Sequence, residues 1–89
     1  MKIKEGFRMR RLGRDHIVVA EGRGLVNFNK MIVLNDTAAY LWDAVQGKDF
    51  DAASLSSLLC EKFEGVSAQQ ALSDSESLLS KWMEEGLVE

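Results

Sequence analysis

Hydrophobic and polar positions alternate in two different ways along this chain, and the change of pattern divides it into two parts. In the first 34 residues, apolar side chains recur at every second position or in short β-branched runs, which is typical of strands. From residue 35 onward they recur at intervals of three and four residues, which is typical of helices with one buried face. The sequence therefore predicts a sheet followed by helices, in one α+β domain over residues 1–89.

Four segments of the first part have the pattern of strands. Residues 7–12 alternate at their start, and a tight turn at residues 13–15 separates them from the β-branched run 16–20. Shorter strand candidates follow at residues 25–28 and 31–34, after a turn or bulge rich in glycine. The pattern predicts a small antiparallel sheet of three to four strands.

Capping residues and terminal glycines predict three helices in the second part. Asn, Asp and Ser are preferred N-caps because their side-chain oxygens accept hydrogen bonds from the free N–H groups of the first turn. Glycine commonly follows the last turn of a helix. Ser67 and Gln70 have the sequence of a capping box, and Phe50 and Leu55 that of a hydrophobic staple. The expected helices are residues 36–46 between Asn35 and Gly47, the segment from Asp51 to Gly65, and the segment from Ser67 to Gly86.

Large apolar residues on these helices predict a common core. Its expected members are Leu41, Trp42, Leu59, Phe63, Leu78 and Trp82. The third helix carries two neighbouring stripes, turned by about 100° from one another. One stripe is Ala71, Ser75, Leu78 and Trp82, and the other is Leu72, Glu76, Leu79 and Met83. One stripe is enough to attach a helix to a small core, so the second either widens the buried arc or lines a groove.

The shortest connection in the chain joins the strand candidate 31–34 to the helix that begins after Asn35. Such a join ties a strand rigidly to the helical part of the domain, and the outer edge of that strand can remain open. An open strand edge beside a helix is a natural site for an extended peptide, which adds to the sheet as a further strand.

Composition excludes several classes of protein. No apolar run approaches the roughly 20 residues of a membrane helix. No signal peptide is recognisable, and Cys60 is the single cysteine, so we expect a cytoplasmic protein without a disulfide or membrane association. Residues 1–30 hold eight basic and three acidic residues, a balance of +5, whereas residues 31–89 hold three and eleven, a balance of −8. Either the two parts attract each other within the domain, or the basic part faces an acidic partner.

Residues suited to catalysis are scarce. His16 is the only histidine, and the sequence places no nucleophile or orienting acid beside it. One cysteine and one histidine cannot form a structural zinc site by themselves. The segment 22–24 lacks the remaining glycine and the strand-to-helix setting of a dinucleotide-binding loop. We therefore expect no enzymatic activity, no cofactor and no metal.

A strand meander with three helices also suggests a winged helix, so a nucleic-acid-binding or regulatory domain is the alternative function. A helix that approaches phosphates should be basic. The third predicted helix has one lysine, Lys81, against Asp74, Glu76, Glu84 and Glu85. We expect no nucleic-acid binding, and a plain dimerisation module is the third possibility.

One motif stands out in the chain, the Leu-Asn-x-Thr-Ala block at residues 34–38. It belongs to a wider pattern that consists of residues 31–34, residues 35–42, Gly47, residues 55–63, Leu78, Leu79, Trp82 and the ending 85–88. This pattern resembles the PqqD-like family, named after pyrroloquinoline quinone synthesis protein D, whose members are recognition elements for ribosomally made, post-translationally modified peptides. Residues 24–30 are longer than the family's minimal hairpin.

The resemblance implies a non-catalytic peptide-binding module. Such modules capture the leader of a precursor peptide and present it to a modifying enzyme, often a radical S-adenosylmethionine enzyme. The peptide adds beside the strand that precedes the first helix, and its side chains enter a groove against the third helix. The implied peptide-binding residues here are Met31, Ile32, Val33, Leu34, Leu72, Glu76, Leu79 and Met83. We expect the module to be a monomer or a weak dimer.

Overall fold

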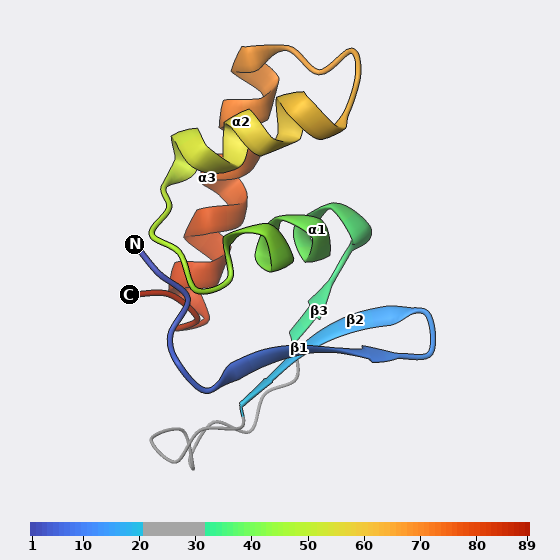
Figure 1. Cartoon of the computed structure of the whole chain (residues 1–89), viewed down its shortest axis with the longest axis vertical. Helices are drawn as coiled ribbons and strands as arrows, with labels where there is room; N and C mark the ends of the chain where they lie inside the picture. The colour runs from blue at the N-terminus through green and yellow to red at the C-terminus, as the bar shows by residue number, and fades with distance from the viewer. Residues whose placement is uncertain (21–31) are drawn as a thin grey trace.

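The computed structural model describes residues 1–20 and 32–89 of the chain. Three strands precede three helices, in the order β1 (Phe7–Leu12), β2 (Asp15–Ala20), β3 (Ile32–Leu34), α1 (Asp36–Val45), α2 (Ala52–Lys62) and α3 (Ala68–Glu84) (Figure 1). This arrangement confirms the predicted α+β fold, with an antiparallel sheet followed by three helices. The strand candidate at residues 25–28 and the first residue of the candidate at 31–34 lie outside the described residues.

The three strands form one antiparallel sheet in the order β1-β2-β3. In its register Met9 lies opposite Val18, and Val18 lies opposite Ile32, so these three side chains share the face that packs on the helices. Neighbouring residues of a strand point to opposite faces. Leu12 and Val33 therefore lie on the other face, and both are largely exposed.

All three predicted N-caps are confirmed. Each capping side chain accepts a hydrogen bond from the backbone N–H three residues further on, which satisfies a donor that has no partner within the helix. The bonds run to Asn35 from Ala38 (2.8 Å), to Asp51 from Ser54 (2.8 Å) and to Ser67 from Gln70 (3.1 Å).

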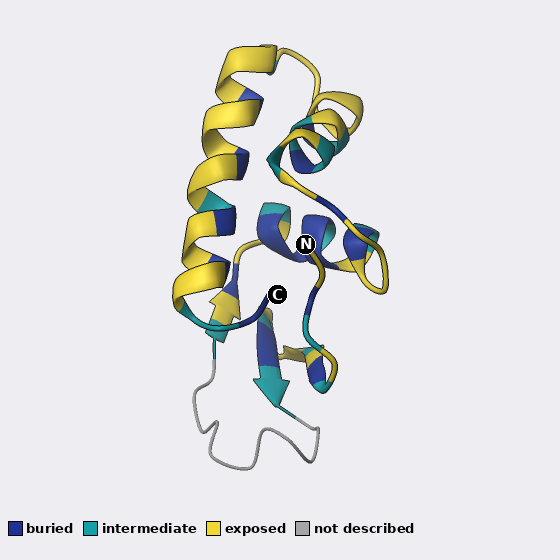
Figure 2. Cartoon of the chain, turned by 90° about the vertical axis from the view of Figure 1, so that its left-hand side faces the viewer, coloured by how far each residue is buried: buried dark blue, intermediate teal, exposed yellow. Residues whose placement is uncertain are grey.

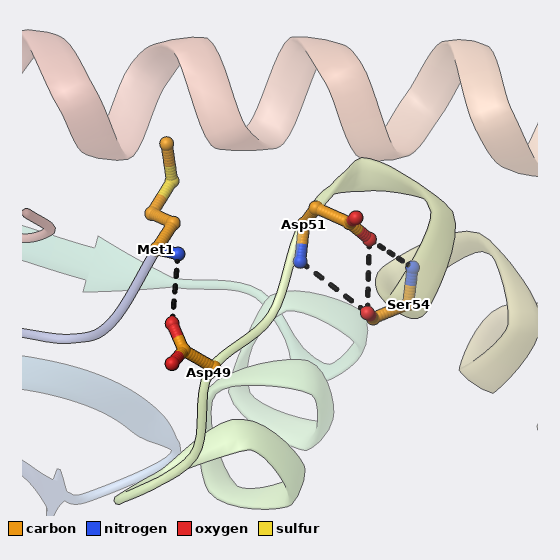
Figure 3. A network of polar contacts seen from close by, with 4 residues as sticks. All are labelled: Met1, Asp49, Asp51 and Ser54. Atoms are coloured by element: carbon orange, nitrogen blue, oxygen red, sulfur yellow. Dashed lines mark hydrogen bonds and ion pairs between the residues drawn. The ribbon is translucent and has the colours of Figure 1, made fainter.

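The reciprocal capping box forms at the second helix and not at the third, where it was expected. The Ser54 hydroxyl accepts from the backbone N–H of Asp51 at 3.3 Å and donates to the Asp51 carboxylate at 2.9 Å (Figure 3). At the third helix only the Ser67 half forms, because the Gln70 side-chain amide instead donates to Asp74 at 2.9 Å. The Gln70 amide thus bonds one turn further along α3.

Helix α3 ends in a Schellman motif that turns the chain back toward the core. The N–H of Gly86 donates to the carbonyl of Met83 at 3.1 Å, and the N–H of Leu87 donates to the carbonyl of Trp82 at 2.9 Å. Gly86 has φ of 74°, a conformation that costs glycine little because it has no Cβ. The motif directs Leu87 inward, where its side chain is fully buried.

The last residues then pair with the first residues of the chain. Ile3 lies opposite Val88 in an antiparallel bridge, and Lys2 and Glu89 exchange two backbone hydrogen bonds of 2.8 Å each. Figure 1 shows the two termini side by side. The ammonium group of Met1 forms an ion pair of 3.0 Å with Asp49, which lowers the pKa of that carboxyl (Figure 3). Leu87 and Val88 are both buried in the core.

The core joins all three helices to the inner face of the sheet, and Trp42 and Trp82 are its largest members. Their rings meet edge to face, with centroids 5.3 Å apart and planes at 84°. Leu41 and Leu59 belong to the same cluster, as predicted. No helix in the described part of the chain is long and apolar enough to cross a membrane.

Two expected core residues differ from the prediction. Phe63 is 36% exposed because α2 ends at Lys62 and Phe63 adopts an extended conformation, so its side chain no longer follows the helical period. Leu55, one turn before Leu59, is fully buried on α2. Leu78 is only partly buried and packs against the margin of the cluster.

We predict that Trp42→Ala lowers the free energy of unfolding by about 3–5 kcal/mol, because a fully buried ring would be replaced by a cavity beside Trp82. Urea unfolding followed by far-ultraviolet circular dichroism measures the change. Met83→Ala, on the exposed side of α3, is the matched control and should stay within about 0.5 kcal/mol of the parent. Equal effects of the two substitutions would contradict the packing described above.

We predict that the caps of α2 and α3 differ in their pH dependence. Backbone and hydroxyl hydrogen bonds from Ser54 lower the pKa of the Asp51 carboxyl from its ordinary value of 3.8. A pKa lowered by folding means that the carboxylate stabilises the fold above the unfolded-state pKa and loses this effect as the pH falls through the lower folded-state value. Asp51→Ala should therefore reduce the urea midpoint at neutral pH, and the difference should shrink below about pH 4.

Ser67→Ala supplies the control for this titration. It should cost about 1 kcal/mol, and the cost should not change with pH, because the Ser67 hydroxyl does not ionise in this range. Urea midpoints of the three proteins from neutral pH to strongly acidic pH give the comparison. A constant difference between Asp51→Ala and the parent would show that the charge on Asp51 has no part in the cap.

Candidate functional site

A pocket lies where β3, the first turn of α1 and the last turns of α3 meet. Its volume is about 130 Å³. Figure 2 shows the short strand β3 beside the last turns of α3, at the end of the helix that is nearest the sheet. We call this site the β3–α3 groove. It is lined by Ile32, Val33, Leu34, Asn35, Ala38, Leu78, Lys81, Trp82 and Glu85.

The groove has an apolar floor and a polar rim. Leu34, Ala38 and Trp82 are buried, and Leu78 is half-buried. Lys81 is exposed and contributes a charged group at the rim. An engineered cavity of about 150 Å³ holds a benzene ring, so the groove has room for one apolar side chain.

β3 is a short edge strand. It spans three residues and pairs with β2 along one side, with Val33 opposite Ile17. Within residues 1–20 and 32–89, β2 is its only strand neighbour. The side chain of Val33 is 60% exposed on the sheet face away from the helices. An edge strand offers backbone N–H and C=O groups to a further strand, and here that further strand would run beside the groove.

The connection between β3 and α1 holds the edge strand in place. Asn35 directly follows Leu34 and caps α1 by accepting from the backbone N–H of Ala38. His16, on β2 opposite Leu34, lies 3.3 Å from the carboxylate of Asp36 in the first turn of α1. β3 is thus fixed to the sheet on one side and to the start of a packed helix at its end.

The structure brings the strand side of the predicted site to the groove. Ile32, Val33 and Leu34 line it, whereas Met31 lies outside the described residues. The helix side differs from the sequence expectation. Leu72, Glu76 and Met83 are exposed on α3 and do not line the groove, and Leu79 is buried in the core with 9% of its surface exposed.

The helix wall of the groove consists of Leu78, Lys81, Trp82 and Glu85 instead. Periodicity gives the angle between two stripes on a helix, but the rotation of the helix about its own axis is set by tertiary packing. In α3 the buried residues are Ala71, Ser75, Leu79 and Trp82, and this rotation carries Leu78 to the edge of the core. The sequence contained one signal for this wall, because Leu78 is followed at helical spacing by the charged residues Lys81 and Glu85. The same pattern also occurs on ordinary solvated helix faces.

Other chemistry-bearing residues form no further centre in the described part of the chain. Cys60 is an exposed free thiol on α2. No group of three or more His, Cys, Asp or Glu residues that could hold a metal ion occurs among the residues that the structure describes. The β3–α3 groove, in which a strand edge lies beside a small apolar pocket, is the candidate binding site.

Comparison with known proteins identifies the family. Neither the curated proteins nor the solved structures gave a significant match. The sequence model of the family described as Coenzyme PQQ synthesis protein D (PqqD) matches residues 15–88, which extend from the start of β2 to the penultimate residue. Since this match covers most of the chain, the protein belongs to the PqqD family.

Proposed function

We propose that this protein is a non-catalytic peptide-binding module. It captures the leader segment of a ribosomally made precursor peptide in the β3–α3 groove and presents that peptide to a modifying enzyme. The observation that carries the proposal is an edge strand beside a pocket for one side chain, in a chain of the PqqD family.

The geometry supports strand addition as the mode of binding. A peptide that pairs with β3 has alternate side chains on opposite faces. Those on the inner face enter the groove against Leu78 and Trp82, and those on the outer face lie beside Val33. Backbone pairing supplies the register, and the pocket supplies sequence preference. The interface is small, so we expect micromolar to sub-micromolar affinity, about −8 to −10 kcal/mol.

The role of an accessory protein follows from the same family membership. Membership in the PqqD family is consistent with a role as the peptide-binding partner of a modifying enzyme. The sequence resemblance makes a radical S-adenosylmethionine enzyme our first candidate for that partner. We propose that the module works in the cytoplasm, as a monomer or weak dimer.

The nucleic-acid alternative has less physical support. The exposed residues of α3 include Asp74, Glu76 and Glu84, and their charge would repel a phosphate backbone.

We predict that Leu78→Glu weakens binding of the cognate peptide at least tenfold, because a carboxylate would be desolvated in the apolar floor of the groove. The peptide is first sought among products of the short reading frames beside the gene. Leu72→Glu is the matched control, since Leu72 is an exposed leucine on the same helix outside the groove. It should bind like the parent, and circular dichroism should show that both variants remain folded.

Amide-shift mapping on the unsubstituted protein tests the same site without a mutation. Shifts clustered on residues 32–38 and 78–85 would support the proposal. Shifts confined to Arg8, Arg10 and Arg11 on β1 would contradict it and would indicate an electrostatic partner on the basic strand.

A further inference from the structure

We infer that the β3–α3 groove is selective for an acidic peptide segment, with Lys81 as the residue that determines this selectivity. The segment carries one aliphatic side chain, which fills the pocket, and a carboxylate two residues away on the same face, which meets Lys81. The inference rests on the proposed function and names the chemistry of its ligand.

Lys81 differs from the other residues of the groove in its charge and in its surroundings. It is the single basic residue of α3, and it is the single basic residue that lines the pocket. Within the described parts of the chain, its ammonium group forms no ion pair. Glu85, the other charged residue of the lining, already has an interaction of its own. The ammonium of Lys81 is thus the group at the rim that can receive a new partner.

A docked peptide would cover the rim and remove water from Lys81. Partial burial of an ammonium group is unfavourable unless an opposite charge or hydrogen-bond acceptors replace the lost water. A carboxylate on the peptide supplies that replacement, and a lysine or arginine at the same place would be repelled. The selectivity therefore follows from the position of Lys81 beside an apolar pocket, where docking removes water from its ammonium group. A lysine that stays exposed in the complex would discriminate little between acidic and basic peptides.

The dimensions of the groove set the spacing between the anchor and the carboxylate. Side chains on one face of an extended peptide recur about every 6.6 Å. Leu78 and Lys81 are three residues apart on α3, which corresponds to a rise of about 4.5 Å along the helix axis. The flexible four-carbon stem of lysine can span the remaining difference. A carboxylate two residues from the anchor is accordingly within reach of Lys81.

The net negative charge of residues 31–89 makes the inference testable. Residues 31–89 carry a balance of −8, so long-range attraction alone would favour basic peptides. A preference for a carboxylate at one peptide position is opposite in sign to that general effect. It can therefore be assigned to a local contact.

The test is a selection of peptides from a random phage-displayed library on the immobilised full chain, at an ionic strength of about 0.15 M. We expect the selected peptides to share an aliphatic residue with Asp or Glu two positions away. Selection on Lys81→Glu should lose this acidic preference and favour Lys or Arg at the same position. A peptide selected on the parent should bind Lys81→Glu about tenfold more weakly by fluorescence anisotropy, and Lys81→Gln should give a smaller loss.

Lys48→Glu is the matched control. It changes the net charge by the same amount at an exposed lysine in the α1–α2 connection, whereas the groove lies at the opposite end of α1. Its binding should stay within about twofold of the parent, since long-range charge effects are screened by salt. Circular dichroism of the three variants verifies that each is folded.

Each result discriminates the inference from the function on which it rests. Selected peptides that shift amides of residues 32–38 and 78–85 without an acidic preference would overturn the inference and leave the proposed function standing. Equal losses of peptide affinity in Lys81→Glu and Lys48→Glu would likewise overturn the inference and leave the proposed function standing. Selected peptides that shift amides elsewhere, or a selection without any specific binder, would overturn the proposed function together with the inference.

Discussion

The edge-to-face contact of Trp42 with Trp82 is the interaction on which the groove depends. It joins α1 to α3 at the centre of the core, with ring centroids 5.3 Å apart. β3 continues into α1 through the single capping residue Asn35, so whatever holds α1 against α3 also holds β3 beside α3. Trp82 itself lines the pocket. The same side chain thus stabilises the fold and forms the floor of the proposed binding site.

The turn that ends α3 also helps to hold Trp82 in place. The Schellman motif at Gly86 turns Leu87 and Val88 into the core, where Val88 pairs with Ile3. Phe50 packs edge to face on Trp82 from the connection between α1 and α2, with ring centroids 6.2 Å apart. Trp82 is therefore held by contacts from segments distant in the sequence, and these contacts position the last turns of α3.

Local signals predicted the elements of this fold well, because caps, terminal glycines and periodicity act within a few residues of each other. The three N-caps and the ends of α1 and α3 follow from such signals, whereas α2 ends at Lys62, before the expected stop at Gly65. The prediction failed where the outcome depends on packing between elements. Phe63 lies just past the last helical residue of α2, so a difference of one residue at the helix end moved it out of the core.

In the candidate site, too, the part set by local sequence was predicted and the part set by packing between elements was not. Its strand wall was predicted from sequence, because a strand joined to a helix without a loop has a defined position. Its helix wall was assigned to the stripe Leu72, Glu76, Leu79 and Met83, whereas the groove is lined by Leu78, Lys81, Trp82 and Glu85. One residue on a helix corresponds to a rotation of about 100°, so the sequence alone does not fix which stripe faces the strand. The packing of α3 against α2 and of Trp82 against Trp42 and Phe50 fixes that rotation. The Ser67 capping box failed for a comparable reason, since Gln70 had a competing acceptor in Asp74.

An apolar core joins the two oppositely charged parts of the chain. The polar contacts that connect them include Met1 with Asp49 and His16 with Asp36, and both carboxylates are largely exposed. Exposed pairs contribute little to stability. The apolar core instead joins the sheet to the helices, as Phe7 and Val18 pack in the same cluster as Trp42.

A short edge strand and a single small pocket together determine what kind of recognition is possible. Backbone pairing to the three residues of β3 is nearly independent of the peptide's sequence, so it provides affinity without sequence selectivity. An apolar pocket for one side chain distinguishes aliphatic residues from polar ones, but it discriminates weakly among aliphatic residues. Further sequence selectivity must come from a polar or charged group at the rim. Such a group discriminates best when it binds the correct peptide favourably and makes an unfavourable contact with incorrect ones. Lys81 meets both conditions, because docking without a counter-charge would bury its ammonium group and docking with a like charge would repel it.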